Sequence, residues 1–201
     1  MLASLLLMAA LMPATAKTPP SVSPAEVAAC VALRALPAHS LDLLEARQTE
    51  DGRQALMALA QAEGVAAEDQ AWWREQLAQA EDVDGDQLRR WAEQGFERCA
   101  ARIAPQSLPG QRALCGADLD TLPVILLYRA DGLALHEAQR DLREGTAAAA
   151  DGIEAARAEA MLRFSYDGAA PRKGGTERWM RERQQAWVAR CLRTAPAGAR
   201  P

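Results

Sequence analysis

The sequence predicts an all-α protein, built as a disulfide-stabilised helical bundle or as two similar helical lobes. Apolar residues recur along most of the 201-residue chain at the three- and four-residue spacing of amphipathic helices. Alanine is the commonest apolar residue, which favours helix but buries little area. Four cysteines provide covalent links that a core with few large side chains needs.

The first residues have the pattern of a secretory signal peptide. An apolar run at 2–12 is followed by Pro13 and by Ala14-Thr15-Ala16, the small-x-small sequence of a signal-peptidase site. The run is shorter than the roughly 20 residues that a membrane-spanning helix needs. No Lys or Arg precedes it, so the amine of Met1 supplies the positive charge or the start codon lies upstream. We therefore expect a periplasmic or secreted protein with no transmembrane segment after cleavage.

The expected organisation has two lobes of similar plan. Each lobe has a cysteine-bearing helix, an Asp-Gly turn, a middle helix, a long amphipathic helix and a helix with Arg-Cys, which indicates an internal duplication. The alternative is that any alanine-rich helical chain with four cysteines divides into two similar parts. The expected segments are a signal peptide at 1–16, a linker at 17–24, lobe 1 at 25–104, a linker at 105–110, lobe 2 at 111–194 and a disordered tail at 195–201.

In lobe 1, turn residues and prolines set the expected helix ends. Ser23 caps a helix at 24–36, and Pro37 ends it. Ser40 caps a short helix at 41–47, and Asp51-Gly52 breaks the chain. A third helix follows up to Gly64, and a fourth covers 66–80. The last is an acidic turn and helix at 82–103, with one apolar face formed by Leu88, Trp91, Gly95, Phe96, Cys99 and Ile103.

Lobe 2 begins with a cysteine-bearing helix from about residue 111. The apolar run 122–128 is predicted to be a buried helix with Pro123 in its first turn, because no partner strand is present. Asp131-Gly132 forms a turn, and the next helix is closed by Gly145. A helix at 153–164 buries Ile153, Ala160, Met161 and Phe164, a loop covers 167–175, and the last helix spans 176–193.

The four cysteines predict two disulfides, because an even number in an exported chain is typical of a disulfide framework. Three pairings are possible. The pairing of Cys30 with Cys99 and of Cys115 with Cys191 closes loops of similar size and keeps each bridge within one lobe. No CxxC sequence is present, which excludes a thioredoxin-like redox motif.

A partial calcium-loop pattern starts at Asp82. Oxygen ligands are present at the loop positions of Asp82, Asp84, Asp86 and Glu93. The glycine that the loop needs at its sixth position is replaced by Gln87, and two arginines follow. The alternative is a tight turn in which Asp84 or Asp86 caps the helix. We expect no cofactor, and these four residues are weak calcium candidates only.

Two features predict an interface with another macromolecule. Trp72 and Trp73 are adjacent, so one ring points away if the other is buried, and exposed tryptophan commonly marks a contact surface. The last helix is rich in arginine, including Arg178, Arg181 and Arg190. These guanidinium groups suit an acidic protein, an anionic envelope component or the chain's own acidic first half. The alternative is an ordinary solvated face.

One helix resembles a segment of a known family. The sequence Arg183-Gln-Gln-Ala-Trp-Val-Ala-Arg-Cys191 is similar to the Gln-x-x-Trp, Arg and Cys pattern of periplasmic lysozyme inhibitors of the LprI type. The resemblance covers this helix alone and implies no membership of the family.

The predicted function is that of a non-enzymatic exported protein that binds another macromolecule, as an inhibitor, immunity or accessory factor of the bacterial envelope. No HExxH, GxSxG or nucleotide-binding glycine motif is present, and the net charge of −4 gives no support for nucleic acid. The partner is expected to be a periplasmic protein or envelope component. One alternative is an envelope hydrolase with an unrecognised Asp/Glu acid–base pair, and another is a calcium-responsive module that uses Asp82 to Glu93.

Overall fold

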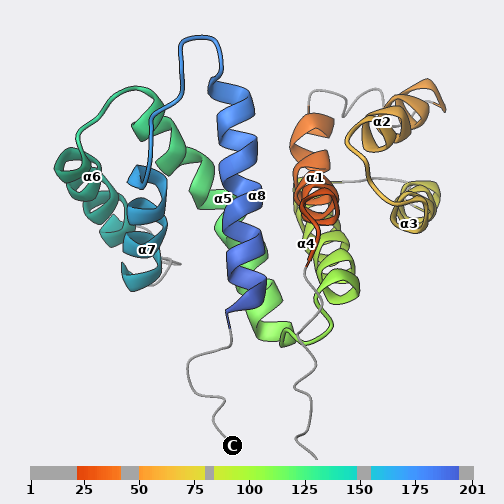
Figure 1. Ribbon diagram of the computed structural model, residues 1–201. Helices are drawn as coiled ribbons and strands as arrows, with labels where there is room; N and C mark the ends of the chain where they lie inside the picture. The colour runs from red at the N-terminus through yellow and green to blue at the C-terminus, as the bar shows by residue number, and fades with distance from the viewer. Residues whose placement is uncertain (1–21, 42–49, 80–83, 149–154, 195–201) are drawn as a thin grey trace, which may run out of the picture.

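The computed structural model describes residues 22–41, 50–79, 84–148 and 155–194, and every regular element in these ranges is an α-helix. The all-α prediction is therefore confirmed. Within the same ranges, no helix is both long and apolar enough to cross a membrane. Figure 1 shows the helices, which are α1 (Pro24–Leu41), α2 (Glu50–Ala62), α3 (Ala67–Gln79), α4 (Gly85–Ile103), α5 (Pro109–Ala130), α6 (Leu135–Ala148), α7 (Ala155–Tyr166) and α8 (Thr176–Arg193).

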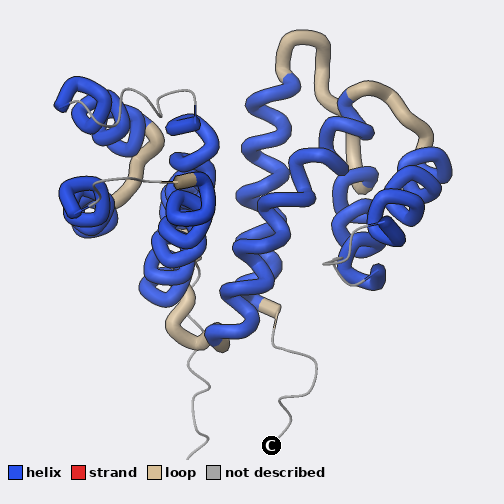
Figure 2. Tube along the Cα trace, turned by 180° about the vertical axis from the view of Figure 1, so that it is seen from behind, coloured by secondary structure: helices blue, strands red, loops and turns tan. Residues whose placement is uncertain are grey.

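Four helices form the middle of the molecule. α1 packs on α4, α5 packs on α8, and the two pairs meet because α4 also contacts α5 and α1 contacts α8. Figures 1 and 2 show α2 and α3 on the outer side of the α1–α4 pair, and α6 and α7 on the outer side of the α5–α8 pair.

The two disulfides are those that the sequence predicted. Cys30 is bonded to Cys99, with their Cα atoms 5.4 Å apart, and this bridge ties α1 to α4. Cys115 is bonded to Cys191, with their Cα atoms 5.8 Å apart, and this bridge ties α5 to α8. Each pair of central helices is therefore covalently closed.

The buried apolar side chains form two clusters. The first lies mainly among α1 to α4 and also takes in Cys115 and Leu119 of α5 and Val188 and Leu192 of α8. The second lies among α5 to α8 and includes Leu122, Ile125, Leu126, Met161, Leu162 and Trp187. The first cluster thus draws residues from both sides of the linker expected at 105–110, and the division into two lobes remains a prediction.

Side-chain caps start two helices as the sequence predicted. Ser23 and Glu26 form a reciprocal capping box, in which each backbone N–H donates to the other side chain, at 3.1 and 3.2 Å. The hydrogen bonds from Ser23 lower the pKa of the exposed Glu26 carboxyl. At the start of α4, Asp84 Oδ1 accepts from the backbone N–H of Gln87 at 2.6 Å. Of the two cap candidates there, Asp84 is therefore the cap.

Several expected helix ends were wrong because packing outweighs local propensity. α1 does not end before Pro37 but continues to Leu41, so Ser40 lies inside a helix rather than at the start of one; residues 42–47 of the expected short helix lie outside the described residues. Asp51-Gly52 lies in the first turn of α2 rather than breaking the chain. α1 gains enough from burying Val27, Leu33 and Leu36 to offset one missing backbone hydrogen bond.

In the second half, α5 is one helix from Pro109 to Ala130, and Pro123 lies inside it rather than in a first turn. Leu122, Ile125 and Leu126 on either side of this proline are fully buried, so continuing the helix places them in the second cluster. α6 likewise runs past Gly145 to Ala148. Ala160 was predicted to face inward but is exposed on α7, and Ile153 lies outside the described residues. The turn at Asp131-Gly132 and the bounds of α8 were predicted correctly.

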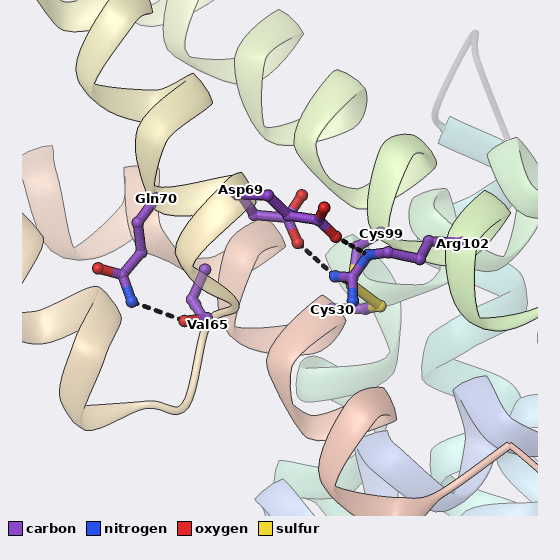
Figure 3. A network of polar contacts seen from close by, with 7 residues as sticks. Cys30, Val65, Asp69, Gln70, Cys99 and Arg102 are labelled. Carbon is purple, nitrogen blue, oxygen red and sulfur yellow. Dashed lines mark hydrogen bonds and ion pairs between the residues drawn. A yellow bond between two sulfur atoms is a disulfide. The ribbon is translucent and has the colours of Figure 1, made fainter.

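Each disulfide lies next to a buried carboxylate paired with an arginine. In Figure 3, Asp69 of α3 contacts Arg102 of α4 at 2.5 Å, and the same guanidinium is 3.7 Å from Cys99 Sγ. In the second cluster, Asp118 of α5 accepts two hydrogen bonds from Arg157 of α7. That guanidinium is 3.3 Å from the sulfur of Cys191. These pairs neutralise charges that could not otherwise be buried.

Gly116 of α5 allows the close approach of α4. A Cβ atom at this position would lie 2.9 Å from Cδ1 of Phe96, whose ring is 1% exposed and held in the first cluster. We predict that Gly116→Ala lowers the free energy of unfolding by about 1–3 kcal/mol, because the Phe96 ring or the α5 backbone must shift to admit the methyl group. Gly110→Ala is the matched control on the same helix, since a Cβ there meets nothing within 4 Å. Urea denaturation of both variants checks this, and equal stability would contradict it.

Candidate functional site

A pocket of about 540 Å³ lies between α4 and α5, next to α1. This volume falls in the range of small-ligand sites. Six of its ten lining residues are apolar or glycine, and the other four are polar or charged. The lining residues are Arg34, Glu93, Gln94, Phe96, Glu97, Pro109, Gly110, Ala113, Gly116 and Ala117.

Small residues on one face of α5 create this space. Gly110, Ala113 and Ala117 recur at the three- and four-residue spacing that places them on one side of a helix. Their side chains do not fill the region beside α4, where Glu93 and Glu97 are one turn apart. Phe96 forms apolar surface of the pocket beneath Gly116. The α5 side of the pocket is thus lined by small apolar residues, whereas α4 contributes both Phe96 and the polar residues Glu93, Gln94 and Glu97.

Arg34 of α1 supplies a buried cation to the pocket. Its side chain is only 6% exposed, and its Nη2 donates to Asp120 Oδ2 at 2.6 Å. Its Nη1 lies 3.7 Å from a carboxylate oxygen of Glu93, too far for a hydrogen bond. Among the described residues this buried Nη1 has no hydrogen-bond acceptor.

Glu97 of α4 likewise has one buried side-chain atom without a hydrogen-bond partner among the described residues. Its Oε1 accepts from Arg112 Nε at 2.8 Å and also pairs with Nη2 at 2.7 Å. The Arg112 guanidinium is fixed in turn by the backbone carbonyl of Ser107. The other oxygen of Glu97, Oε2, is buried and has no donor among the described residues. Both Arg34 Nη1 and Glu97 Oε2 are thus covered by protein atoms rather than open to the pocket, and Arg34 Nη1 keeps its ion pair with Glu93.

An exposed apolar surface continues from the pocket along α5. Of the described residues, five large apolar side chains are exposed, and four of these belong to α5 or its N-cap. Leu108, Leu114, Val124 and Leu127 are each between 44 and 52% exposed. Leu114, Val124 and Leu127, together with the exposed Ala117, form what we call the α5 face. Asp120 lies among these residues and pairs with Arg34 of the pocket.

The two tryptophans predicted to mark an interface pack largely inside the protein. Trp73 is 3% exposed and its ring stands edge-on to Trp91, with centroids 5.9 Å apart. Trp72 is half-buried against the first cluster, and the guanidinium of Arg98 lies 5.5 Å above its ring. The indole N–H of Trp73 is buried without an acceptor among the described residues.

The three arginines predicted to form part of an interface lie apart along α8. Arg178 is exposed in the first turn. Arg181 pairs with Glu63, just beyond the end of α2, at 2.7 Å, so it links α8 to the α2–α3 connection. Arg190 lines a hollow of about 590 Å³ on the α7 side, together with Glu159, Arg163 and Asp167.

The carboxylates weighed for calcium are used in other ways. Asp82 lies outside the described residues. Asp84 caps α4, and Asp86 forms an ion pair with Arg89. Glu93 is in the third turn of α4, about 13 Å along the axis from Asp84, and lies near Arg34 instead. In the ranges that the structure describes, no three His, Cys, Asp or Glu side chains are grouped to hold a metal ion.

One feature of the sequence, the isolated charge of Arg34, indicates this pocket. Arg34 is the only charged residue between Val27 and Leu36, a segment that is otherwise apolar and mostly buried. A lone charge in a buried helix needs a partner, which indicates a polar site. Glu97 gave no such signal, because it is one of many acidic residues.

Comparison of the chain with protein-family models, curated proteins and solved structures finds no match.

Proposed function

We propose that this protein is an exported, non-enzymatic helical protein that binds another protein through the α5 face and the adjoining pocket. The observation that carries the proposal is the concentration of exposed large apolar side chains on one helix, α5 and its N-cap. Aliphatic side chains left in water cost about 25 cal/mol for each Å² that a partner would cover. Contiguous apolar surface on a soluble helical protein commonly marks a contact with another protein.

The rigidity of the central helices supports the same proposal. Disulfides tie α5 to α8 and α4 to α1, and the ion pair of Glu97 with Arg112 links α4 to α5, which supports a surface that is formed before a partner arrives. A preorganised surface loses little conformational entropy on binding. Disulfides persist mainly in oxidising compartments, which supports a periplasmic or secreted location together with the signal peptide expected at 1–16. An inhibitor, immunity or accessory factor of the envelope fits these properties.

Photocrosslinking in living cells tests this function. A benzoylphenylalanine in place of Leu114 or Val124 is expected to give one discrete adduct with a different protein, because both positions are exposed on the α5 face. The same group in place of Arg178, which is exposed on α8, is the matched control. It also tests the alternative interface that the sequence predicted at the arginines of this helix. The adduct at 114 should be lost when Leu127→Glu is added. Adducts at 178 alone, or only between copies of this chain, would contradict the proposal.

A further inference from the structure

We infer that the Lys173–Gly174 peptide bond is a cleavage site for an endopeptidase specific for basic residues, and that the cut protein stays folded as two disulfide-linked chains. The site lies in the loop 167–175, which joins α7 to α8 and contains no residue of the α5 face. The inference therefore does not rest on the proposed function. In Figures 1 and 2 this loop arches beyond the first turn of α8, at the top of each view.

Arg172 and Lys173 differ from every other basic residue in the described ranges. All the other arginines there lie within helices, and Lys173 is the only lysine there. A helix uses its backbone N–H and C=O groups in internal hydrogen bonds, so an endopeptidase cannot pair with them until the helix opens. Both residues are exposed, as are most of their neighbours in the loop. Among the described residues, a basic side chain and an accessible backbone therefore coincide only in this loop, and exposed loops are the preferred sites of proteolysis.

The backbone of the loop can open to the extended form that an endopeptidase binds. The turn from Arg172 to Gly175 is closed by a hydrogen bond from the Gly175 N–H to the Arg172 carbonyl oxygen, at 2.9 Å. Gly174 has a φ of 78° in this turn, and a glycine moves from there to the extended region at little steric cost. The hydrogen bond from Arg129 Nη2 to the Gly168 carbonyl, at 3.2 Å, lies upstream and can remain. Opening the turn therefore breaks far fewer hydrogen bonds than opening a helix.

The residues around the bond fit an endopeptidase whose specificity pocket contains a carboxylate. Lys173 offers its ammonium group to that carboxylate, and Arg172 places a second cation next to it. Gly174 and Gly175 follow the bond and have no side chain that could clash with the enzyme. The reaction consumes one water molecule. Its oxygen bonds to the carbonyl carbon of Lys173, the C–N bond to Gly174 breaks, and the products are the Lys173 carboxylate and the Gly174 ammonium group.

The cut protein keeps its fold because both ends of the loop are anchored. On the α7 side, Tyr166 Oη donates to the Leu133 carbonyl at 3.0 Å, and on the α8 side Trp179 packs against the second cluster. The Cys115–Cys191 disulfide joins α5, in the first fragment, to α8, in the second. No residue of the loop belongs to either cluster, so the cut removes no side chain from the core.

Digestion of the full, oxidised protein with a lysine-specific endopeptidase tests the inference. The sequence contains two lysines, Lys17 and Lys173, so a cut at the second gives the fragment 174–201. We expect this fragment to separate on a denaturing gel only after reduction, and the helical circular dichroism to persist in the cut, oxidised protein. The inference fails if Lys173 resists an enzyme dose that cuts the reduced, unfolded chain. It also fails if the fragment separates without reductant, or if the cut protein loses its helical signal.

A matched variant distinguishes the loop from simple exposure of a lysine. The Arg163 side chain is 75% exposed but lies within α7, between Leu162 and Phe164, which pack in or against the second cluster. In the double variant Arg163→Lys/Lys173→Gln, cleavage at position 163 should be at least about 100-fold slower than cleavage at Lys173 in the natural chain, because several backbone hydrogen bonds must open first. Equal rates at the two positions would overturn the inference.

Discussion

Replacing Cys30 and Cys99 together by alanine is expected to lower the free energy of unfolding by about 4 kcal/mol. The bridge closes a loop with a sequence separation of 69 residues, and its loss frees the unfolded chain to sample many more conformations. Both cysteines are also fully buried, so the missing sulfur atoms leave a small cavity in the first cluster and add to the loss. Urea denaturation of the double variant, monitored by tryptophan fluorescence, measures the change.

The second bridge provides the matched comparison. Cys115 and Cys191 have a sequence separation of 76 residues, so the chain-entropy contribution is nearly the same. Cys191 is only partly buried, and its replacement leaves less unfilled space. The Cys115/Cys191 variant should therefore lose slightly less stability than the Cys30/Cys99 variant. A loss below about 1 kcal/mol for both pairs would show that the bridges do not restrict the unfolded chain as argued.

Asp118→Ala is expected to destabilise the protein by about 3–5 kcal/mol. The carboxylate is 1% exposed and accepts from Arg157 Nε at 2.5 Å, from Arg157 Nη2 at 2.6 Å and from Trp187 Nε1 at 2.6 Å. Its removal leaves a largely buried guanidinium without its counter-ion and a buried indole N–H without its acceptor. The network joins α5, α7 and α8, so one substitution weakens three contacts between helices.

Two controls make this prediction specific. Asp118→Asn keeps one acceptor oxygen and should lose less stability than Asp118→Ala. Asp141→Ala removes a partly exposed carboxylate that lies 3.7 Å from Arg140, and should change the free energy of unfolding by less than about 0.5 kcal/mol. The melting temperature of the three variants at pH 7 checks the order. If Asp118→Ala matched Asp141→Ala, the buried network would have no net stabilising effect.

Most of the correct predictions concerned features that depend on the sequence of a single helix. The apolar face of α4 and the cap at Asp84 follow from spacing and from the hydrogen bonds that helix starts require. The disulfide pairing followed from loop sizes and from the similar positions of the cysteines on their helices. Each of these predictions needed only local chemistry or a comparison within the chain.

The features that were missed depend on which helix covers which face. α5 is apolar around most of its circumference, so its periodicity could not show that Leu122 would be buried and Leu114 exposed. The positions of the neighbouring helices decide this, since Leu122 is buried in a cluster with residues of α6, α7 and α8. Pro37 and Pro123 were expected to limit helices, and burial of their neighbours overrode that preference. The sequence did not decide which of Trp72 and Trp73 would be buried, and the packing of Trp73 against Trp91 is a contact that no local pattern encodes.

The mixed composition of the first cluster has a consequence for biosynthesis. Val188 and Leu192 belong to the last helix yet complete the core beneath α1 and α4. A nascent chain that has emerged only as far as α4 therefore lacks part of the surface against which its own helices pack. Translation must pass α8 before either cluster is whole, because both clusters include residues of this helix. The core around α1 and α4 is therefore complete only after α8 has been synthesised.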